Sequence, residues 1–294
     1  MRYPQLSPLP GEDHAWPPPL VVAAHGSTDP RAAATVTDLA SLVRARAGRA
    51  GLPGLTVQAA YLAHALPSVP DALEALHGDG LSRAVVLPLL LTEAYHSDTD
   101  LPAVLRAASR RLPGLRLAYG RPLGPHPLLL RALERRLAEA GAPAAADTAV
   151  VLAAAGSSRP AANAAVARAA RAWRGWRSVI PAYASAASPA PARAVGLLRQ
   201  DGAPQVVVAT YLLAPGVFAD QVREQSLAAG ADAVSAALGA APEVADLIIE
   251  RYVQAAALRG PVSAGRRAFA MAPDDGEMGP RGDAHDAAGA ACHA

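Results

Sequence analysis

An internal repeat is the sequence feature that most constrains how this chain can fold. The segment "VVAAHGSTDP" (21–30) returns as "VLAAAGSSRP" (151–160), with six of ten positions identical. Three more pairs of similar segments follow in the same order along the chain: 60–67 with 182–189, 79–91 with 201–213, and 123–127 with 238–242. Matches in a fixed order indicate two copies of one structural unit, and we place the join near Gly141–Asp147.

Each copy alternates short apolar runs with helix-like segments. In the first copy we expect strands at Leu20–Ala24, Leu55–Leu62, Arg83–Leu91 and 115–120. Helices are expected over Pro30–Ala47, 68–78, 97–112 and 126–141, and the first of these begins with a proline suited to a first helical turn. Strands that alternate with helices predict a parallel sheet covered by helices on both faces. The chain is therefore expected to be an α/β protein of two tandem lobes, at 18–141 and 147–258.

Composition excludes several classes of function. The net charge is +2 without a long basic block, which gives no support for a nucleic-acid-binding groove. The sequence contains no run of about 18 apolar residues, so no membrane span is predicted. The proline-rich start lacks the apolar core of a signal peptide. The single cysteine, Cys292, allows no intramolecular disulfide. We expect a cytoplasmic monomer with a flexible segment at 1–17 and a disordered tail at 261–294.

Two histidines are candidates for metal binding. His25 directly follows the first strand, and His96 comes five residues after the third strand's expected end at Leu91. In the common doubly wound order these two strands are neighbours, so both histidines are expected on one rim of the sheet, where ligands of such sheets bind. Two neutral imidazoles suit a divalent iron, cobalt or nickel ion. A hydrogen-bonded structural role is the alternative for either residue.

The segment "HGSTDPR" also permits a phosphate-binding interpretation. Gly26, Ser27 and the start of the next helix could hold an anion, and His25 could carry a phosphoryl group. The glycine pattern of a nucleotide-binding loop is absent, however, and no Gly-Lys-Ser/Thr sequence occurs. The metal-binding interpretation of His25 is therefore favoured over the phosphohistidine one, which would be detected as phosphate labelling at His25.

Four motifs in order resemble the sirohydrochlorin chelatase family. They are "AAHGSTDPR", "AYLAHALPSVPDAL", "RAVVLPLLLTEAYHSDTDLP" and "LGPHPLL", and the resemblance extends over roughly residues 18–256. The duplicated form with a degenerate second copy resembles the long actinobacterial members. The resemblance implies two flavodoxin-like, chelatase-like lobes that face one another. It also implies a lyase that inserts Fe²⁺ or Co²⁺ into sirohydrochlorin, for sirohaem or cobalamin, without nucleotide hydrolysis.

The resemblance assigns roles to particular residues. The family's metal-handling histidines correspond to His25 and His96, which fall on Ala155 and Phe218 in the second copy. We therefore expect metal chemistry in the first lobe only, with the second lobe as a wall of the substrate site. Substrate carboxylates are expected at the two Gly-Ser turns and the arginines after them, and the macrocycle at a phenylalanine: Ser27, Arg31, Ser157, Arg159 and Phe218. The alternative for the arginines is a solvated position at a helix start, and the alternative for Phe218 is a place in the core.

One position departs from the family pattern. The acidic residue that often follows the aromatic-Leu pair on the second strand is replaced by Ala63. This leaves the proton acceptor open, with His64 or Glu93 as substitutes. It also keeps a second hypothesis in view, a non-catalytic carrier of tetrapyrrole or metal ions.

Overall fold

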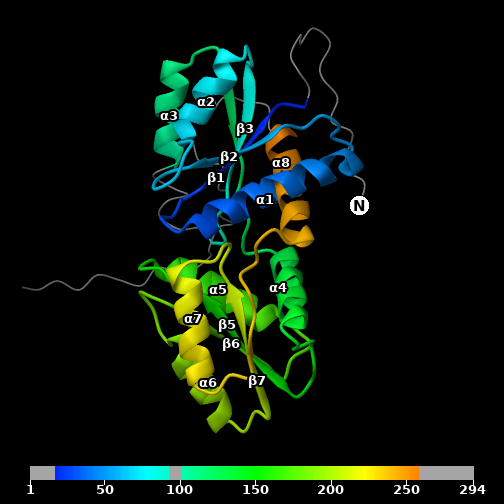
Figure 1. Cartoon of the computed structure of the whole chain (residues 1–294), viewed down its shortest axis with the longest axis vertical. Helices are drawn as coiled ribbons and strands as arrows, with labels where there is room; N and C mark the ends of the chain where they lie inside the picture. The colour runs from blue at the N-terminus through cyan, green and yellow to red at the C-terminus, as the bar shows by residue number, and fades with distance from the viewer. Residues whose placement is uncertain (1–16, 93–100, 258–294) are drawn as a thin grey trace, which may run out of the picture. The chain divides into compact units, whose positions relative to one another are not determined.

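The computed structural model describes residues 17–92 and 101–257, which form two four-stranded parallel sheets (Figure 1). The first sheet has the order β2-β1-β3-β4 and the second the order β6-β5-β7-β8. The strands of the first sheet are β1 (Leu20–Ala24), β2 (Val57–Tyr61), β3 (Arg83–Pro88) and β4 (Arg116–Tyr119). Those of the second are β5 (Thr148–Ala154), β6 (Ser178–Tyr183), β7 (Gln205–Tyr211) and β8 (Ala233–Val234). The two-lobed parallel α/β fold is confirmed, and β1 and β3 are neighbours as expected.

Helices connect the strands in both halves. In the first half they are α1 (Pro30–Ala47), α2 (Val69–Gly78), α3 (Leu101–Arg111) and α4 (Pro127–Glu139). In the second half they are α5 (Pro160–Ala172), α6 (Pro191–Gln200), α7 (Val217–Ala228) and α8 (Pro242–Ala257). Helix α1 begins where the sequence predicts, because the Asp29 side chain accepts a hydrogen bond from the Arg31 backbone N–H. A capping box between Ser68 and Asp71 fixes the start of α2.

Strand β3 is shorter than the apolar run that predicted it. The run continues to Leu91, but the strand ends at Pro88, which has no backbone N–H to donate to the sheet. The backbone nevertheless stays beside β1 for one more residue, since the Leu89 N–H donates to the Ala23 carbonyl at 2.8 Å. Farther along, the Leu91 carbonyl accepts a hydrogen bond from the Tyr211 hydroxyl at 3.0 Å. The apolar run therefore continues beyond the end of β3, because Leu89 is buried and Leu90 and Leu91 are half-buried against other segments of the chain.

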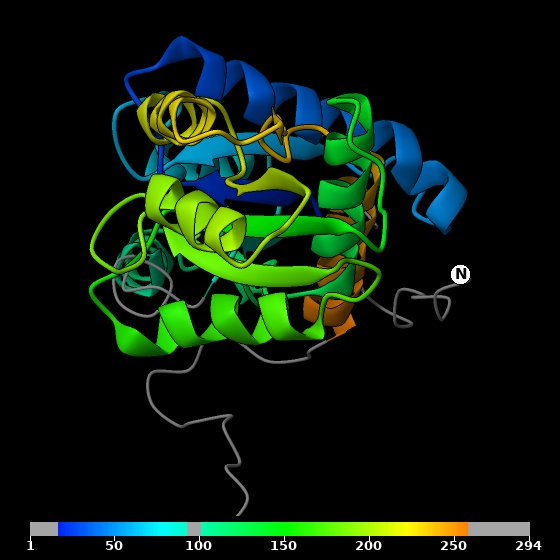
Figure 2. The same ribbon diagram turned by 90° about the horizontal axis from the view of Figure 1, so that it is seen from below.

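The last helix of each half packs on the sheet of the other half. Helix α8 lies against α1, β3 and β4, and α4 lies against β7, while the two helices also contact each other (Figures 1 and 2). The Tyr252 hydroxyl of α8 donates to the Pro18 carbonyl at 2.8 Å. The Trp173 indole N–H, next to α5, donates to Glu134 of α4 at 2.7 Å. One large apolar core consequently runs through both halves, because each exchanged helix contributes side chains to it.

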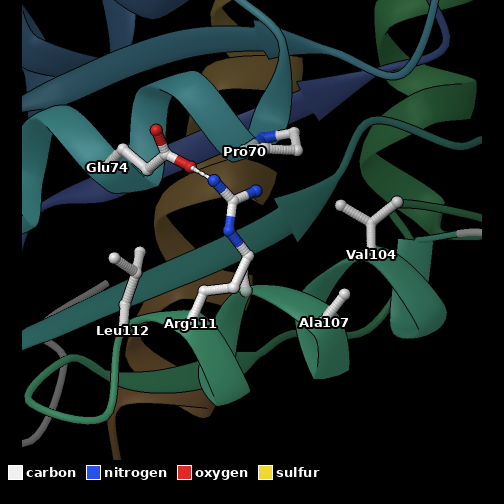
Figure 3. A pocket seen from close by; sticks show the side chains of 7 residues that line it. Pro70, Glu74, Val104, Ala107, Arg111 and Leu112 are labelled. Atoms are coloured by element: carbon white, nitrogen blue, oxygen red, sulfur yellow. Dashed lines mark ion pairs between the residues drawn. The ribbon is translucent and has the colours of Figure 1, made fainter.

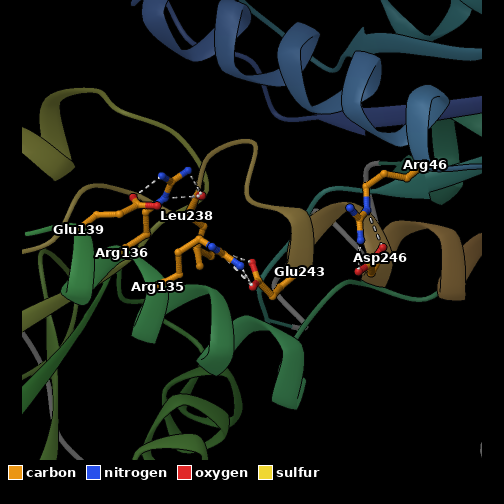
Figure 4. A network of polar contacts seen from close by, with 7 residues as sticks. All are labelled: Arg46, Arg135, Arg136, Glu139, Leu238, Glu243 and Asp246. Carbon is orange, nitrogen blue, oxygen red and sulfur yellow. Dashed lines mark hydrogen bonds and ion pairs between the residues drawn. The ribbon is translucent and has the colours of Figure 1, made fainter. Parts of the chain in front are cut away.

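Polar contacts accompany this exchange of helices (Figure 4). Arg46 of α1 pairs with Asp246 of α8 at 2.6 Å, and Arg135 of α4 pairs with Glu243 of α8 at 2.6 Å. Arg136 donates to the Leu238 carbonyl at 2.9 Å, which ties α4 to the segment that precedes α8. These contacts link α8 to α1 and to α4, alongside the apolar packing of the exchanged helices.

Some expectations concern residues that the structure does not describe. They are those for 1–16 in the N-terminal segment, for 93–100, where His96 lies and the helix expected over 97–112 begins, and for the tail at 261–294. Within the described ranges, no helix has the length and apolar character needed to cross a lipid bilayer.

Candidate functional site

The end of β1 places His25 at the rim of the first sheet. All five residues of β1 are buried, and the strand is paired on both sides, with β2 and with β3. His25 is the next residue, and it is exposed. A buried strand thus ends directly in an imidazole on the side of the sheet where ligands of this fold class bind.

The loop after β1 is held closely against the loop after β2. The Ala63 N–H donates to the His25 carbonyl at 2.9 Å. Gly26 has a φ of +93°, and a Cβ at this position would lie 1.7 Å from the Ala63 carbonyl oxygen. Only glycine fits such a close approach, so the sequence "HG" positions the imidazole relative to the neighbouring loop.

His64 is the second imidazole on this rim. Its ring lies edge-on to that of His25, with the two ring centroids 6.3 Å apart. Its backbone is in the left-handed region, with a φ of 62°. The sequence left the role of His64 open, and its closeness to His25 depends on the pairing of β1 with β2, which no single motif contains.

The turn after His25 organises a cluster of charged side chains. The Ser27 hydroxyl accepts a hydrogen bond from the Asp29 N–H at 3.1 Å. Arg31 pairs with Asp29 and with Asp220 of α7, at 2.6 Å in both cases. The hydrogen bonds from Arg31 lower the pKa of Asp29. Arg31, expected to meet substrate carboxylates, already holds two carboxylates of the protein, so a substrate must displace or share them.

The corresponding turn of the second half has its own hydrogen bonds. The Ser157 hydroxyl accepts from the Arg159 N–H at 3.1 Å, and the Ser157 backbone exchanges two hydrogen bonds with the Asn163 side chain. Arg159 is the N-cap residue of α5. Both serines therefore stabilise their turns through the side-chain oxygen, a role that the sequence did not assign to them.

Phe218 lies in the first turn of α7 and is 45% exposed. The alternative that it belongs to the core is therefore wrong. Its neighbour Val217 is 67% exposed, and Asp220 of the same turn reaches Arg31 of the first half. The start of α7 thus presents apolar surface close to the start of α1. No sequence signal predicted Asp220, because its partner lies in the other half of the chain.

His96 and Glu93 lie outside the described residues. Of the two expected metal ligands, the structure therefore describes His25 alone. Within 17–92 and 101–257, no three or more histidine, cysteine, aspartate or glutamate side chains form a group that could hold a metal ion. In this part of the chain, His25 and His64 are two imidazoles that lie next to each other at the rim.

Two further histidines, His126 and His77, lie at helix ends. His126 is the N-cap of α4, and its Nδ1 accepts a hydrogen bond from the Leu128 N–H at 3.3 Å. Burial lowers the pKa of His126 although Glu250 lies close by. His77 is in the last turn of α2, away from the rim loops.

A shallow apolar groove lies between α2 and α3 and is separate from the rim (Figure 3). It is lined by Val104, Ala107 and Leu112, and an ion pair between Glu74 and Arg111 spans it at 2.6 Å. These helices contribute no imidazole to the groove, so we place the candidate site at the rim and not here.

Comparison with known proteins identifies the class of protein that this fold and rim define. The model of the CbiX family matches residues 19–140 and again residues 149–255. The chain belongs to the CbiX family, with one family unit in each half.

Two curated relatives come from Priestia megaterium. A sirohydrochlorin ferrochelatase is 28% identical over 168 residues, which is 56% of this chain and 63% of the relative. A sirohydrochlorin cobaltochelatase is 30% identical over 176 residues, which is 58% of each chain. The matched regions thus span less than two thirds of either relative.

Solved structures show the same fold. SirB from Bacillus subtilis with Fe³⁺ superimposes with a TM-score of 0.68 at 23% identity, over 81% of this chain and 95% of that one. The SirB complex with cobalt, from B. subtilis subspecies spizizenii, gives a TM-score of 0.62 at 20% identity, over 81% and 94%. The chelatase-like fold expected from the sequence is confirmed.

Proposed function

We propose that this protein is a sirohydrochlorin chelatase, a cytoplasmic lyase that inserts Fe²⁺ or Co²⁺ into the macrocycle without a nucleotide. The proposal rests on the position of His25, an exposed imidazole that directly follows the buried strand β1 at the rim of the first sheet. It is supported by the match of both halves of the chain to one family. The metal ion is a substrate, so a site with few protein ligands suits its transfer better than a closed four-ligand cage.

The second half supplies surface for the tetrapyrrole in this proposal. The exposed ring of Phe218, in the first turn of α7, can pack on a flat macrocycle. Arg31 lies near that turn through its pair with Asp220, and its guanidinium is suited to the carboxylates of the substrate. Ser27, Ser157 and Arg159, in the two Gly-Ser turns, are proposed to line the same site.

Metal insertion requires an ion on the protein and the removal of two protons from the pyrrole nitrogens. We assign the ion first to His25, together with His96 as the resemblance implies. The ion then moves to the macrocycle nitrogens while the protons pass to a basic group or to water. Imidazole accepts iron and cobalt alike, since these metals are close in the Irving–Williams order. The relative rates with Fe²⁺ and Co²⁺ in the assay below distinguish sirohaem from cobalamin chemistry.

The test is an anaerobic assay without nucleotide. The purified protein is mixed with sirohydrochlorin and Co²⁺ or Fe²⁺, and the visible spectrum of the macrocycle is followed. We expect many turnovers per protein molecule and almost none for His25→Ala, because the variant lacks a ligand on the rim. His77→Ala is the matched control and should keep full activity.

Ala63 at the usual acidic position favours a second candidate, a non-catalytic carrier of tetrapyrrole or metal ions. A carrier would change the spectrum only in proportion to the amount of protein. That result, or a rate equal to the protein-free control, would contradict the chelatase proposal.

A further inference from the structure

We infer that His64 joins His25 in binding the metal ion, so that two adjacent rim loops of this chain each supply an imidazole to the metal substrate. The inference rests on the proposed function for the identity of the ion. It goes beyond that function because the family resemblance assigns no role to His64.

The geometry of the two rings fits a shared ion. Their centroids are 6.3 Å apart. With metal–nitrogen distances of about 2.1 Å, two imidazoles on one ion have centroids about 4.6 to 6.5 Å apart, depending on the angle at the metal. The observed distance lies near the upper, wide-angle end of this range, and the rings are inclined by 68°, so one nitrogen of each ring reaches the same ion once the two side chains turn toward each other.

The backbone keeps the two loops in a fixed relation. The Ala63 N–H donates to the His25 carbonyl at 2.9 Å, and the Leu62 N–H donates to the Ala24 carbonyl at 3.0 Å. These hydrogen bonds continue the pairing of β1 with β2 beyond the ends of the strands. Each imidazole is thus attached next to a hydrogen-bonded backbone position, which limits the motion available to the pair.

The repeat provides a comparison within the same molecule. His25 corresponds to Ala155, and His64 corresponds to Ala186, so both imidazoles are absent from the second half. The backbone there is nearly unchanged. The Ser185 N–H donates to the Ala155 carbonyl at 2.9 Å, and Ala186 has a φ of 56°, against 62° for His64.

This comparison separates structure from function. Histidine occurs in the left-handed region more often than most residues, so a purely conformational reason for His64 has to be considered. Ala186 holds the same conformation without an imidazole, so the loop does not require one. The two imidazoles that these loops of the second half lack are neighbours in the first half, which points to a role that both share.

The donor type favours particular ions. Imidazole nitrogen suits cobalt, iron, nickel and zinc, whereas Mg²⁺ and Ca²⁺ prefer oxygen. In the described part of the chain, no acidic cluster accompanies the pair. We therefore expect a site that discriminates strongly against Mg²⁺.

Titration of the full-length protein with Co²⁺ tests the inference without requiring turnover. Binding is followed by calorimetry and by the visible absorption of the bound ion. We expect His64→Ala to weaken Co²⁺ binding by at least about tenfold, the lower end of what loss of an outer-shell partner causes. The variant should fold, since it copies the alanine found at 186. His77→Ala is the matched control and should bind as the wild type does.

A double-variant cycle tests whether the two imidazoles hold the same ion. If they do, His64→Ala should cost much less in the His25→Ala background than in the wild type. Equal Co²⁺ affinity for wild type and His64→Ala, or losses that simply multiply in the double variant, would overturn the inference. Turnover measured on the same preparations keeps this outcome distinct from a failure of the chelatase proposal, which would appear as absent turnover in the wild type.

Discussion

At the scale of single residues, the rim of the first sheet depends on Gly26 as much as on the histidines beside it. Its positive φ and the closeness of the Ala63 carbonyl leave no room for a side chain. Gly156 has the same environment in the second half, where a Cβ would lie 1.9 Å from the Ser185 carbonyl oxygen. The two glycines are therefore equivalent in structure, but only one of them stands beside imidazoles.

This equivalence leads to a paired prediction. Gly26→Ala and Gly156→Ala should each lower the free energy of unfolding by roughly 3 kcal/mol or more, because the loop backbone has to move. Only Gly26→Ala should also weaken Co²⁺ binding. Urea denaturation and Co²⁺ titration measure the two effects.

In the control Gly196→Ala, within α6, the new Cβ meets nothing within 4 Å, and the change should stabilise the protein by about 0.5 to 1 kcal/mol. Equal Co²⁺ affinity in both loop variants would contradict the proposed location of the metal.

At the scale of helices and strands, most elements could be predicted from the sequence. Apolar runs located the strands, and Pro30 located the start of α1. The exchange of α4 and α8 could not be predicted in this way. Both helices have an apolar face, and the pattern of that face is the same whichever sheet it covers. Their packing depends on partners far away in the chain, such as Glu243 for Arg135 and Asp246 for Arg46.

The pair of Arg135 and Glu243 gives this exchange a dependence on pH. Burial opposes the charged form of Glu243, but hydrogen bonds from Arg135 prevail and lower its pKa below the usual value of 4.5. Since the folded pKa is the lower one, the pair's contribution is fully present above about pH 4.5 and is lost as pH falls through the folded pKa. Glu243→Gln should therefore lower the urea midpoint at pH 7, and the difference from wild type should shrink in more acidic solution.

Glu139→Gln is the control for this experiment. Glu139 pairs with Arg136 within α4 and its side chain is 50% exposed, so its loss should have little effect at any pH. A difference between wild type and Glu243→Gln that stays constant down to pH 3 would show that the carboxylate charge is not what stabilises the contact.

At the scale of the whole molecule, the two halves share one framework but differ at the rim. The repeat allowed the two-sheet architecture to be predicted, along with the loss of the first histidine in the second half. It did not predict that the start of α7 meets the start of α1, because that contact joins residues that are not equivalent in the two copies. The ion pair between Arg31 and Asp220 is the clearest case, and it places a carboxylate beside the cation that we assign to substrate binding.

This contact leads to a prediction about affinity for the tetrapyrrole. Sirohydrochlorin carries many carboxylates, so Asp220 both repels it and competes with it for Arg31. Asp220→Asn should strengthen sirohydrochlorin binding by about two- to fivefold at low salt, and the gain should fade at higher ionic strength because these exposed charges are screened. Arg31→Ala should have the opposite effect. Binding is measured by spectroscopic titration without metal, over a series of salt concentrations.

Glu74→Gln, which removes one partner of an exposed ion pair between α2 and α3, is the control and should leave the affinity for sirohydrochlorin unchanged. Weaker binding by Asp220→Asn would mean that Asp220 holds Arg31 in position for the substrate instead of competing with it.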